Sequence, residues 1–120
     1  MAETKASLLS NTPMVPTGGP LPEALAFYTQ QLGFSIDWEG GNMAGVSRDQ
    51  VRFNLVENSS KEWLDNCSIS IGVSDLDALY EEYRQTSSRI NPPKVQPWGR
   101  REFHMIIPSG VCLQFYDQNA

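Results

Sequence analysis

The sequence contains little of what several common classes of protein need. Its 120 residues include only two cysteines and one histidine, and Cys67 and Cys112 lack the short spacing of a redox pair or a zinc motif. No apolar run approaches the roughly 18 to 20 residues of a membrane span. The first ten residues hold no continuous apolar segment and no small-residue cleavage site, so we expect no signal peptide and a cytoplasmic location.

Positive charge is also scarce. The nine Lys and Arg residues are scattered along the chain, and against 14 Asp and Glu they leave a formal net charge of −5 and a pI near 4.7. This balance argues against a surface that binds nucleic acid or an anionic membrane. With 40% hydrophobic residues the chain can bury one core, and we expect a single domain over residues 1–120.

The sequence does contain an internal repeat. Residues 44–57 align with residues 104–117 at a constant separation of 60 positions, and residues 23–28 align with residues 77–82 at a separation of 54. Two copies of one unit therefore fill the chain. A repeated unit of this kind is not expected to bury its apolar face alone.

Each copy of the repeat is predicted to contain one helix and four strands. Helical spacing of apolar residues predicts a helix from Leu21 that Gly33 ends, and a second from Asp75 to about Ser87. Segregated helices over largely antiparallel strands give the α+β class. Prolines at 92, 93 and 97 make one strand an edge or bulged strand. The strand signals cover residues 12–17, 34–39, 43–47, 51–57, 67–73, 94–98, 102–107 and 111–117.

Alternation along these strands predicts a polar face opposite the helices. In residues 67–73 the isoleucines share one face and the serines the other, and a turn at residues 108–110 places His104 near Gln114. Cys67 and Cys112 fall on opposite faces, so we expect buried free thiols rather than a bridge. The predicted concave surface carries Arg52, Asn54, Ser68, Ser70, His104, Gln114 and Tyr116.

Several motifs resemble those of one protein family. Residues 26–34, 44–49, 73–80, 96–100 and 108–110 are similar to the glyoxalase, bleomycin-resistance and extradiol-dioxygenase superfamily, which has the vicinal-oxygen-chelate fold. Within it the sequence is most similar to the bleomycin-resistance proteins. The resemblance covers residues 11–117. It implies paired βαβββ modules at about 11–57 and 67–117, a linker at 58–66, and a homodimer with ligand crevices between the subunits.

The resemblance also implies where a metal would lie in the enzymes of the superfamily. Those positions fall on Pro13, Asn54, Ser68 and Gln114 in this sequence. A catalytic divalent metal needs about three N or O donors, usually imidazole or carboxylate. Proline has no donor, serine is a weak one, and neutral amides lack charge. We therefore expect neither a metal nor another cofactor.

Aromatic and ionisable residues on the predicted face are the candidate ligand contacts. Trp38 and Trp98 are separated by 60 residues, so they occupy matching positions that either stack on a flat ligand or plug the ends of the sheets or the dimer contact. His104 is either a ligand contact, a general acid or base, or an ordinary strand histidine. With no acidic residue clearly placed to orient it, catalysis is the least favoured of the three. Arg100 and Arg101 either lie in a solvated turn, which we favour, or reach an anionic group of a ligand. Trp63 is expected to cap the core or an interface.

The leading hypothesis is a metal-independent protein that binds and sequesters a small planar aromatic or cationic molecule. The acidic excess would suit a cationic ligand. The competing hypothesis is a metal-dependent enzyme of the glyoxalase or dioxygenase type with an atypical site. A third is a dimerising or regulatory module, against which the polar face argues mildly. The predicted ligand contacts are Trp38, Arg52, Asn54, Ser68, Trp98, His104, Gln114 and Tyr116.

Overall fold

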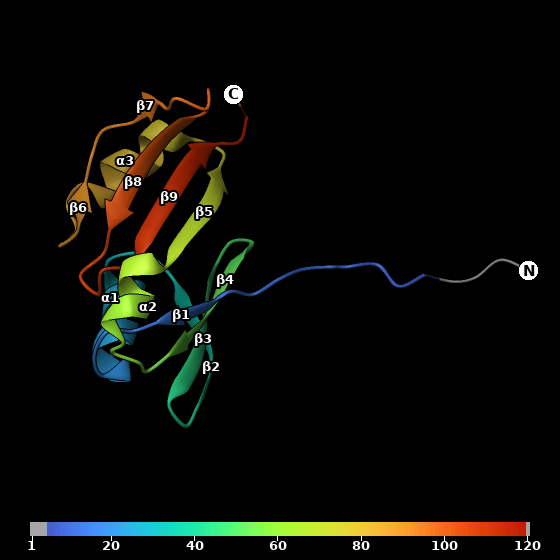
Figure 1. Cartoon of the computed structure of the whole chain (residues 1–120), viewed down its shortest axis with the longest axis vertical. Coiled ribbons are helices and arrows are strands. Elements are labelled where there is room, and N and C mark those ends of the chain that lie inside the picture. Colours follow the sequence, from blue (N-terminus) through green and yellow to red (C-terminus); the bar gives the residue numbers. More distant parts are fainter. Residues whose placement is uncertain (1–4, 120) are drawn as a thin grey trace, which may run out of the picture.

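The computed structural model describes residues 5–119 and contains two mixed β-sheets, each accompanied by a helix (Figure 1). The first sheet has the strand order β1-β4-β3-β2, in which β1 is parallel to β4 and the other neighbours are antiparallel. The α+β class is therefore confirmed. The first unit comprises β1 (Met14–Pro16), α1 (Leu21–Gln30), β2 (Ser35–Gly40), β3 (Met43–Arg48) and β4 (Val51–Val56).

The second unit repeats this topology. Its sheet has the order β5-β9-β8-β6, with β7 also paired to β8, and β5 is again parallel to the last strand. A short helix, α2 (Lys61–Asn66), precedes it. The unit itself comprises β5 (Ser68–Val73), α3 (Leu76–Tyr83), β6 (Arg89–Ile90), β7 (Lys94–Val95), β8 (Arg101–Ile106) and β9 (Cys112–Asp117).

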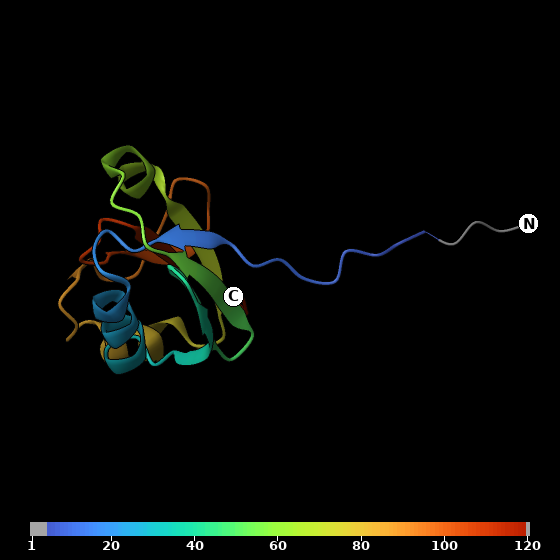
Figure 2. The same cartoon turned by 90° about the horizontal axis from the view of Figure 1, so that it is seen from below.

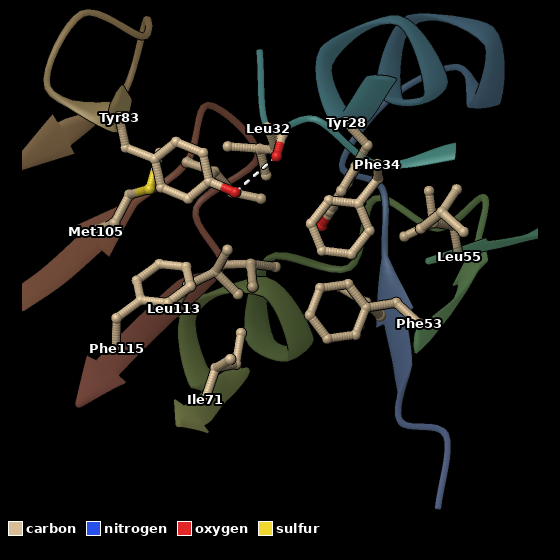
Figure 3. Close-up of a cluster of buried hydrophobic side chains, with 14 of the residues drawn as sticks. Tyr28, Leu32, Phe34, Phe53, Leu55, Ile71, Tyr83, Met105, Leu113 and Phe115 are labelled. Atoms are coloured by element: carbon tan, nitrogen blue, oxygen red, sulfur yellow. Dashed lines mark hydrogen bonds between the residues drawn. The ribbon is translucent and has the colours of Figure 1, made fainter. Parts of the chain in front are cut away.

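Both units contribute to one hydrophobic core. α1 and α3 lie on one side of the curved sheets (Figure 2), and the side chains between them form a single cluster. Phe34 and Phe53 of the first unit stack at 5.4 Å, while Phe115 of the second packs near Tyr83 (Figure 3). The buried Tyr83 hydroxyl donates to the Leu32 carbonyl at 2.6 Å and so joins the two units.

The linker expected at residues 58–66 is only partly irregular, because it contains α2. Ser60 caps this helix by accepting from the Trp63 backbone N–H, and Leu64 is buried. The predicted helix to Ser87 instead ends at Tyr83. The proline-rich segment forms only the two-residue strand β7 at the edge of the sheet, because proline cannot donate to a ladder.

The repeat register shifts by one residue between strands. Gly45 pairs with Asn54, whereas His104 pairs with Gln114, so the counterpart of His104 is Gly45 rather than the buried Ala44. The hairpin between His104 and Gln114 is one residue longer than the hairpin between Gly45 and Asn54. A shift of one residue moves a strand side chain to the other face of the sheet. The expected constant separation of 60 is therefore wrong for β3 and β8.

Candidate functional site

Each sheet has one face turned away from the core, called here the first open face (β1–β4) and the second open face (β5–β9). On the first open face Trp38 lies across Gly45, where an added Cβ would come within 2.1 Å of the indole Nε1. Arg52 and Asn54 also lie on this face, because Phe53 and Leu55 between them are buried. Gly45 is therefore what lets the indole lie flat on the sheet.

The second open face carries the other predicted polar residues. Ser70 and Gln114 are neighbours on paired strands, and the serine hydroxyl lies 3.5 Å from the amide oxygen. Ser68 is exposed at the start of β5, where it pairs with Cys112. His104 pairs directly with Gln114, as the turn at residues 108–110 predicted.

A buried carboxylate, that of Glu102, organises the end of this face. Its side chain is fully buried and accepts three hydrogen bonds. Trp98 Nε1 and Arg100 Nε donate to Oε2 at 2.8 and 2.7 Å, and His104 Nε2 lies 2.8 Å from Oε1. The guanidinium of Arg100 lies 3.8 Å from the Tyr116 ring centroid. We call these five residues the Glu102 cluster.

The Glu102 cluster presents flat groups in a fixed arrangement. The Trp98 and His104 rings are nearly parallel, with 8° between their planes and 6.5 Å between centroids. Burial raises the pKa of Glu102, but hydrogen bonds from Trp98, His104 and Arg100 outweigh it and lower the pKa overall. Glu102 is therefore ionised at neutral pH.

Two expectations about this region are wrong. His104 does have an orienting acid, because Glu102 precedes it by two residues on the same face of β8. Strand alternation was the signal that would have found it. Arg100 is not a solvated turn residue, since it binds Glu102 and stacks on Tyr116, whereas Arg101 pairs with Asp77 at the surface at 2.8 Å.

One chain does not bring all eight predicted contacts together. Trp38 on β2 and Trp98, which follows β7, belong to different sheets whose outer strands lie at opposite ends of the molecule (Figure 1). Both indoles are accessible, 44% and 60% exposed respectively. The residues therefore divide into two groups. Trp38, Arg52 and Asn54 lie on the first open face, and Ser68, Trp98, His104, Gln114 and Tyr116 lie on the second.

A cavity of about 700 Å³ lies elsewhere, between the two units. Its apolar lining includes Phe53, Ile71 and Phe115, which belong to the core side of the sheets. Of the eight predicted contacts only Arg52 borders it. The cavity therefore opens mainly on the core side of the sheets, although Arg52 of the first open face and Ser70 of the second also border it.

The positions implied for a metal hold no strong ligands. Asn54 pairs with Met14 rather than Pro13, and Gln114 pairs with Ser70 rather than Ser68. The side chains that face each other on the paired strands are therefore the Met14 thioether with the Asn54 amide and the Ser70 hydroxyl with the Gln114 amide. This neutral donor set suits a divalent cation poorly. Within residues 5–119 no three His, Cys, Asp or Glu side chains gather in a group that could hold a metal ion.

The two cysteines are half-buried free thiols. Cys67 packs against the core, and burial raises the pKa of its thiol, followed by the proximity of Cys112. Cys67, which caps the C-terminus of α2, and Cys112, which begins β9, are adjacent, since the Cys112 N–H donates to the Cys67 carbonyl at 3.0 Å. The thiols are free as expected, but both are half-buried and not buried.

Comparison with known proteins identifies the family. The model of the Glyoxalase/Bleomycin resistance protein/Dioxygenase superfamily matches residues 17–119. The chain belongs to this superfamily. No protein of curated function matches the sequence. Among the described residues, no helix of this superfamily member is long and apolar enough to cross a membrane.

Solved structures of the superfamily include bleomycin-binding proteins with the same fold. The bleomycin-binding protein of Streptomyces verticillus complexed with copper(II)-bleomycin has a TM-score of 0.85 and 27% identity, covering 96% of this chain and 100% of that chain. A bleomycin-binding protein complexed with bleomycin has a TM-score of 0.82 and 20% identity, and the match covers 93% of this chain and 100% of that chain. A bleomycin resistance determinant encoded on the transposon Tn5 has a TM-score of 0.81 and 22% identity, and the match covers 94% of this chain and 100% of that chain.

Proposed function

We propose that this protein binds and sequesters a planar aromatic or cationic small molecule of the bleomycin type without a metal cofactor of its own. The observation that carries the proposal is the Glu102 cluster, in which the exposed Trp98 indole is held parallel to His104. Stacked aromatic pairs contribute about 0.5–1.5 kcal/mol beyond the area they bury. The solved relatives that are complexed with bleomycin support this class of ligand.

The proposed binding crevice lies between two copies of the chain. Both indoles are accessible, and β2, which carries Trp38, and β7, which precedes Trp98, lie at opposite ends of one molecule (Figure 1), so we do not expect a single chain to place both on one ligand. In a twofold dimer the first open face of one protomer would meet the second open face of its partner. Symmetry would then generate two equivalent crevices, each with one copy of Trp38 and one of Trp98.

Charge supports a cationic or neutral ligand over an anionic one. The chain carries a net charge of −5, which favours the approach of cations over long range. At the second open face Glu102 is already paired with Arg100 and hydrogen-bonded to His104. Stacking and hydrogen bonds from Ser70 and Gln114 would therefore supply the local contacts rather than a single ion pair.

Equilibrium titration with metal-free bleomycin and copper(II)-bleomycin tests the proposal. We expect one ligand per chain at micromolar concentrations, measured by isothermal calorimetry because copper quenches fluorescence by itself. W63F is the control for variants at Trp38 and Trp98, because it removes an indole that lies on α2, outside both open faces. No heat of binding with either ligand would overturn the proposal. Elemental analysis giving about one equivalent of zinc, nickel, manganese or iron per chain would favour the metal-dependent enzyme instead.

Mixing two variants tests the shared crevice. W38A and W98A dimers each lack one indole in every crevice. After chain exchange, half of the dimers carry one intact crevice, so about one quarter of the wild-type binding sites should reappear. If the chains exchange and the mixture still binds as weakly as each variant alone, a crevice built from both chains would be contradicted.

A further inference from the structure

Glu102 is costly to bury, yet it is surrounded by polar partners rather than apolar ones. A carboxylate moved out of water loses several kcal/mol of hydration, and apolar replacements of a buried ion pair are often neutral or stabilising. Its contacts with Trp98, Arg100 and His104 all lie between 2.7 and 2.8 Å. The carboxylate therefore does more than fill space in the sheet.

Each of these contacts fixes the direction of a flat group. The indole N–H of Trp98 and the imidazole of His104 approach different oxygens of one carboxylate, and their rings end 8° from parallel. The Arg100 guanidinium uses the same Oε2 and lies on Tyr116. Removing the carboxylate would leave the indole N–H of Trp98, which is 60% exposed, without the acceptor that it has among the described residues.

In the described residues of the first unit, no buried carboxylate takes the place that Glu102 has in the second unit. The counterparts of Glu102 and His104 on β3 are Met43 and Gly45, and Trp38 is held by lying on the bare backbone of Gly45. Among residues 5–119 no acceptor is recorded for Trp38 Nε1. The two indoles therefore reach their open faces by different physical means, and in the part of the chain that the structure describes the buried charge belongs to the second unit.

We propose that Glu102 is a positioning residue that holds Trp98, His104 and Arg100 in place before a ligand arrives. This inference rests on the proposed function, because the platform it builds is the proposed stacking surface. A preorganised platform strengthens binding by lowering the entropy lost when the ligand orders side chains. Because Glu102 itself is fully buried, its proposed role is to act through these three side chains and not by contacting the ligand.

The first test needs no ligand. The three tryptophans give three indole N–H signals in a ¹H–¹⁵N spectrum, and W98F assigns the signal of Trp98. E102Q replaces a charged acceptor by a neutral amide, so the Trp98 signal should move upfield while those of Trp38 and Trp63 stay. E62Q on α2 is the matched control, because no hydrogen bond is recorded for the Glu62 carboxylate in the described chain. An unmoved Trp98 signal in folded E102Q would overturn the inference.

The second test compares two Trp→Phe variants with metal-free bleomycin as the probe. W98F removes the hydrogen bond to Glu102 and keeps an aromatic ring, whereas W38F removes a similar amount of ring without a recorded hydrogen bond. We expect an affinity about tenfold weaker for W98F than for W38F. Equal losses of affinity in W98F and W38F would overturn the inference. This comparison can be made even if E102Q does not fold. Wild-type protein that binds no bleomycin would overturn the proposed function instead, and the indole signal would still decide the role of Glu102.

Discussion

Tyr83→Phe should destabilise the whole protein, because one hydroxyl connects the two halves of the repeat. The Tyr83 side chain is buried, and its hydroxyl donates to the Leu32 carbonyl at 2.6 Å and accepts from Arg48 Nη1 at 3.0 Å. Arg48 also donates to the Leu32 carbonyl at 2.9 Å, so this acceptor keeps one partner in the variant. The variant therefore loses two hydrogen bonds, but neither partner is orphaned, because Arg48 also keeps its bonds to Glu82.

The magnitude follows from the net value of such a bond. Each of these hydrogen bonds contributes about 0.5–1 kcal/mol when its partner keeps another bond, so the two together contribute about 1–2 kcal/mol. For a chain of this size that loss lowers Tm by roughly 4–8 °C. Urea and thermal unfolding followed by circular dichroism measure both quantities.

Y80F is the matched control on the same helix. Tyr80 is half-buried and packs edge-on against Phe103 at 5.7 Å, and within the described chain no hydrogen bond of its hydroxyl is recorded. Its loss should change stability by less than 0.5 kcal/mol, as surface substitutions usually do. A Y83F protein as stable as wild type, or one that loses no more than Y80F, would refute the reasoning.

Two further predictions concern the same groups under other perturbations. Burial raises the pKa of Tyr83 to about 12. Since the folded pKa exceeds the unfolded value of 10.0, its stabilisation is complete below pH 10 and lost as the pH rises through 12. Urea midpoints measured across this range should fall more steeply for wild type than for Y83F, and parallel curves would argue against it. G45A should displace Trp38 and shift its fluorescence, because the added Cβ would meet the indole at 2.1 Å, whereas nothing lies within 4 Å at Gly40. G40A is therefore the control, and an unchanged emission spectrum of G45A would show that Trp38 does not lie on Gly45.

Much of the fold follows from local sequence patterns. Alternation in residues 67–73 and 111–117 is sufficient to place each strand's apolar side chains on the core side, and the turn at residues 108–110 sets the pairing of His104 with Gln114. Both are short-range consequences of backbone geometry. The short helix α2 was detectable through Ser60 as an N-cap, but six residues give too weak a periodicity to predict.

The site was less predictable, because its partners are set by packing across strands. Alternation puts Glu102 on the same face as His104, but it cannot show that Trp98 and Arg100 fold back over the carboxylate. Their positions depend on the short edge strand β7 and the turn after it, where Gly99 has a positive φ of 92°. Sequence spacing likewise paired Trp38 with Trp98 without showing that β2 and β7, the strands that carry or precede them, lie at opposite ends of one molecule (Figure 1).

The sequence by itself determined the doubled unit, the α+β class, the polar strand faces and the family, because period-two alternation, turn residues and repeat motifs are all written in short segments. Only the tertiary structure decided that Glu102 is buried and paired, that Arg100 lies on Tyr116, and that the two indoles occupy separate faces. The physical reason is that burial and hydrogen-bond partners depend on which strands become neighbours and how far each hairpin extends. A difference of one residue in the second hairpin was enough to place His104 opposite Gln114, where the first unit has Gly45 opposite Asn54.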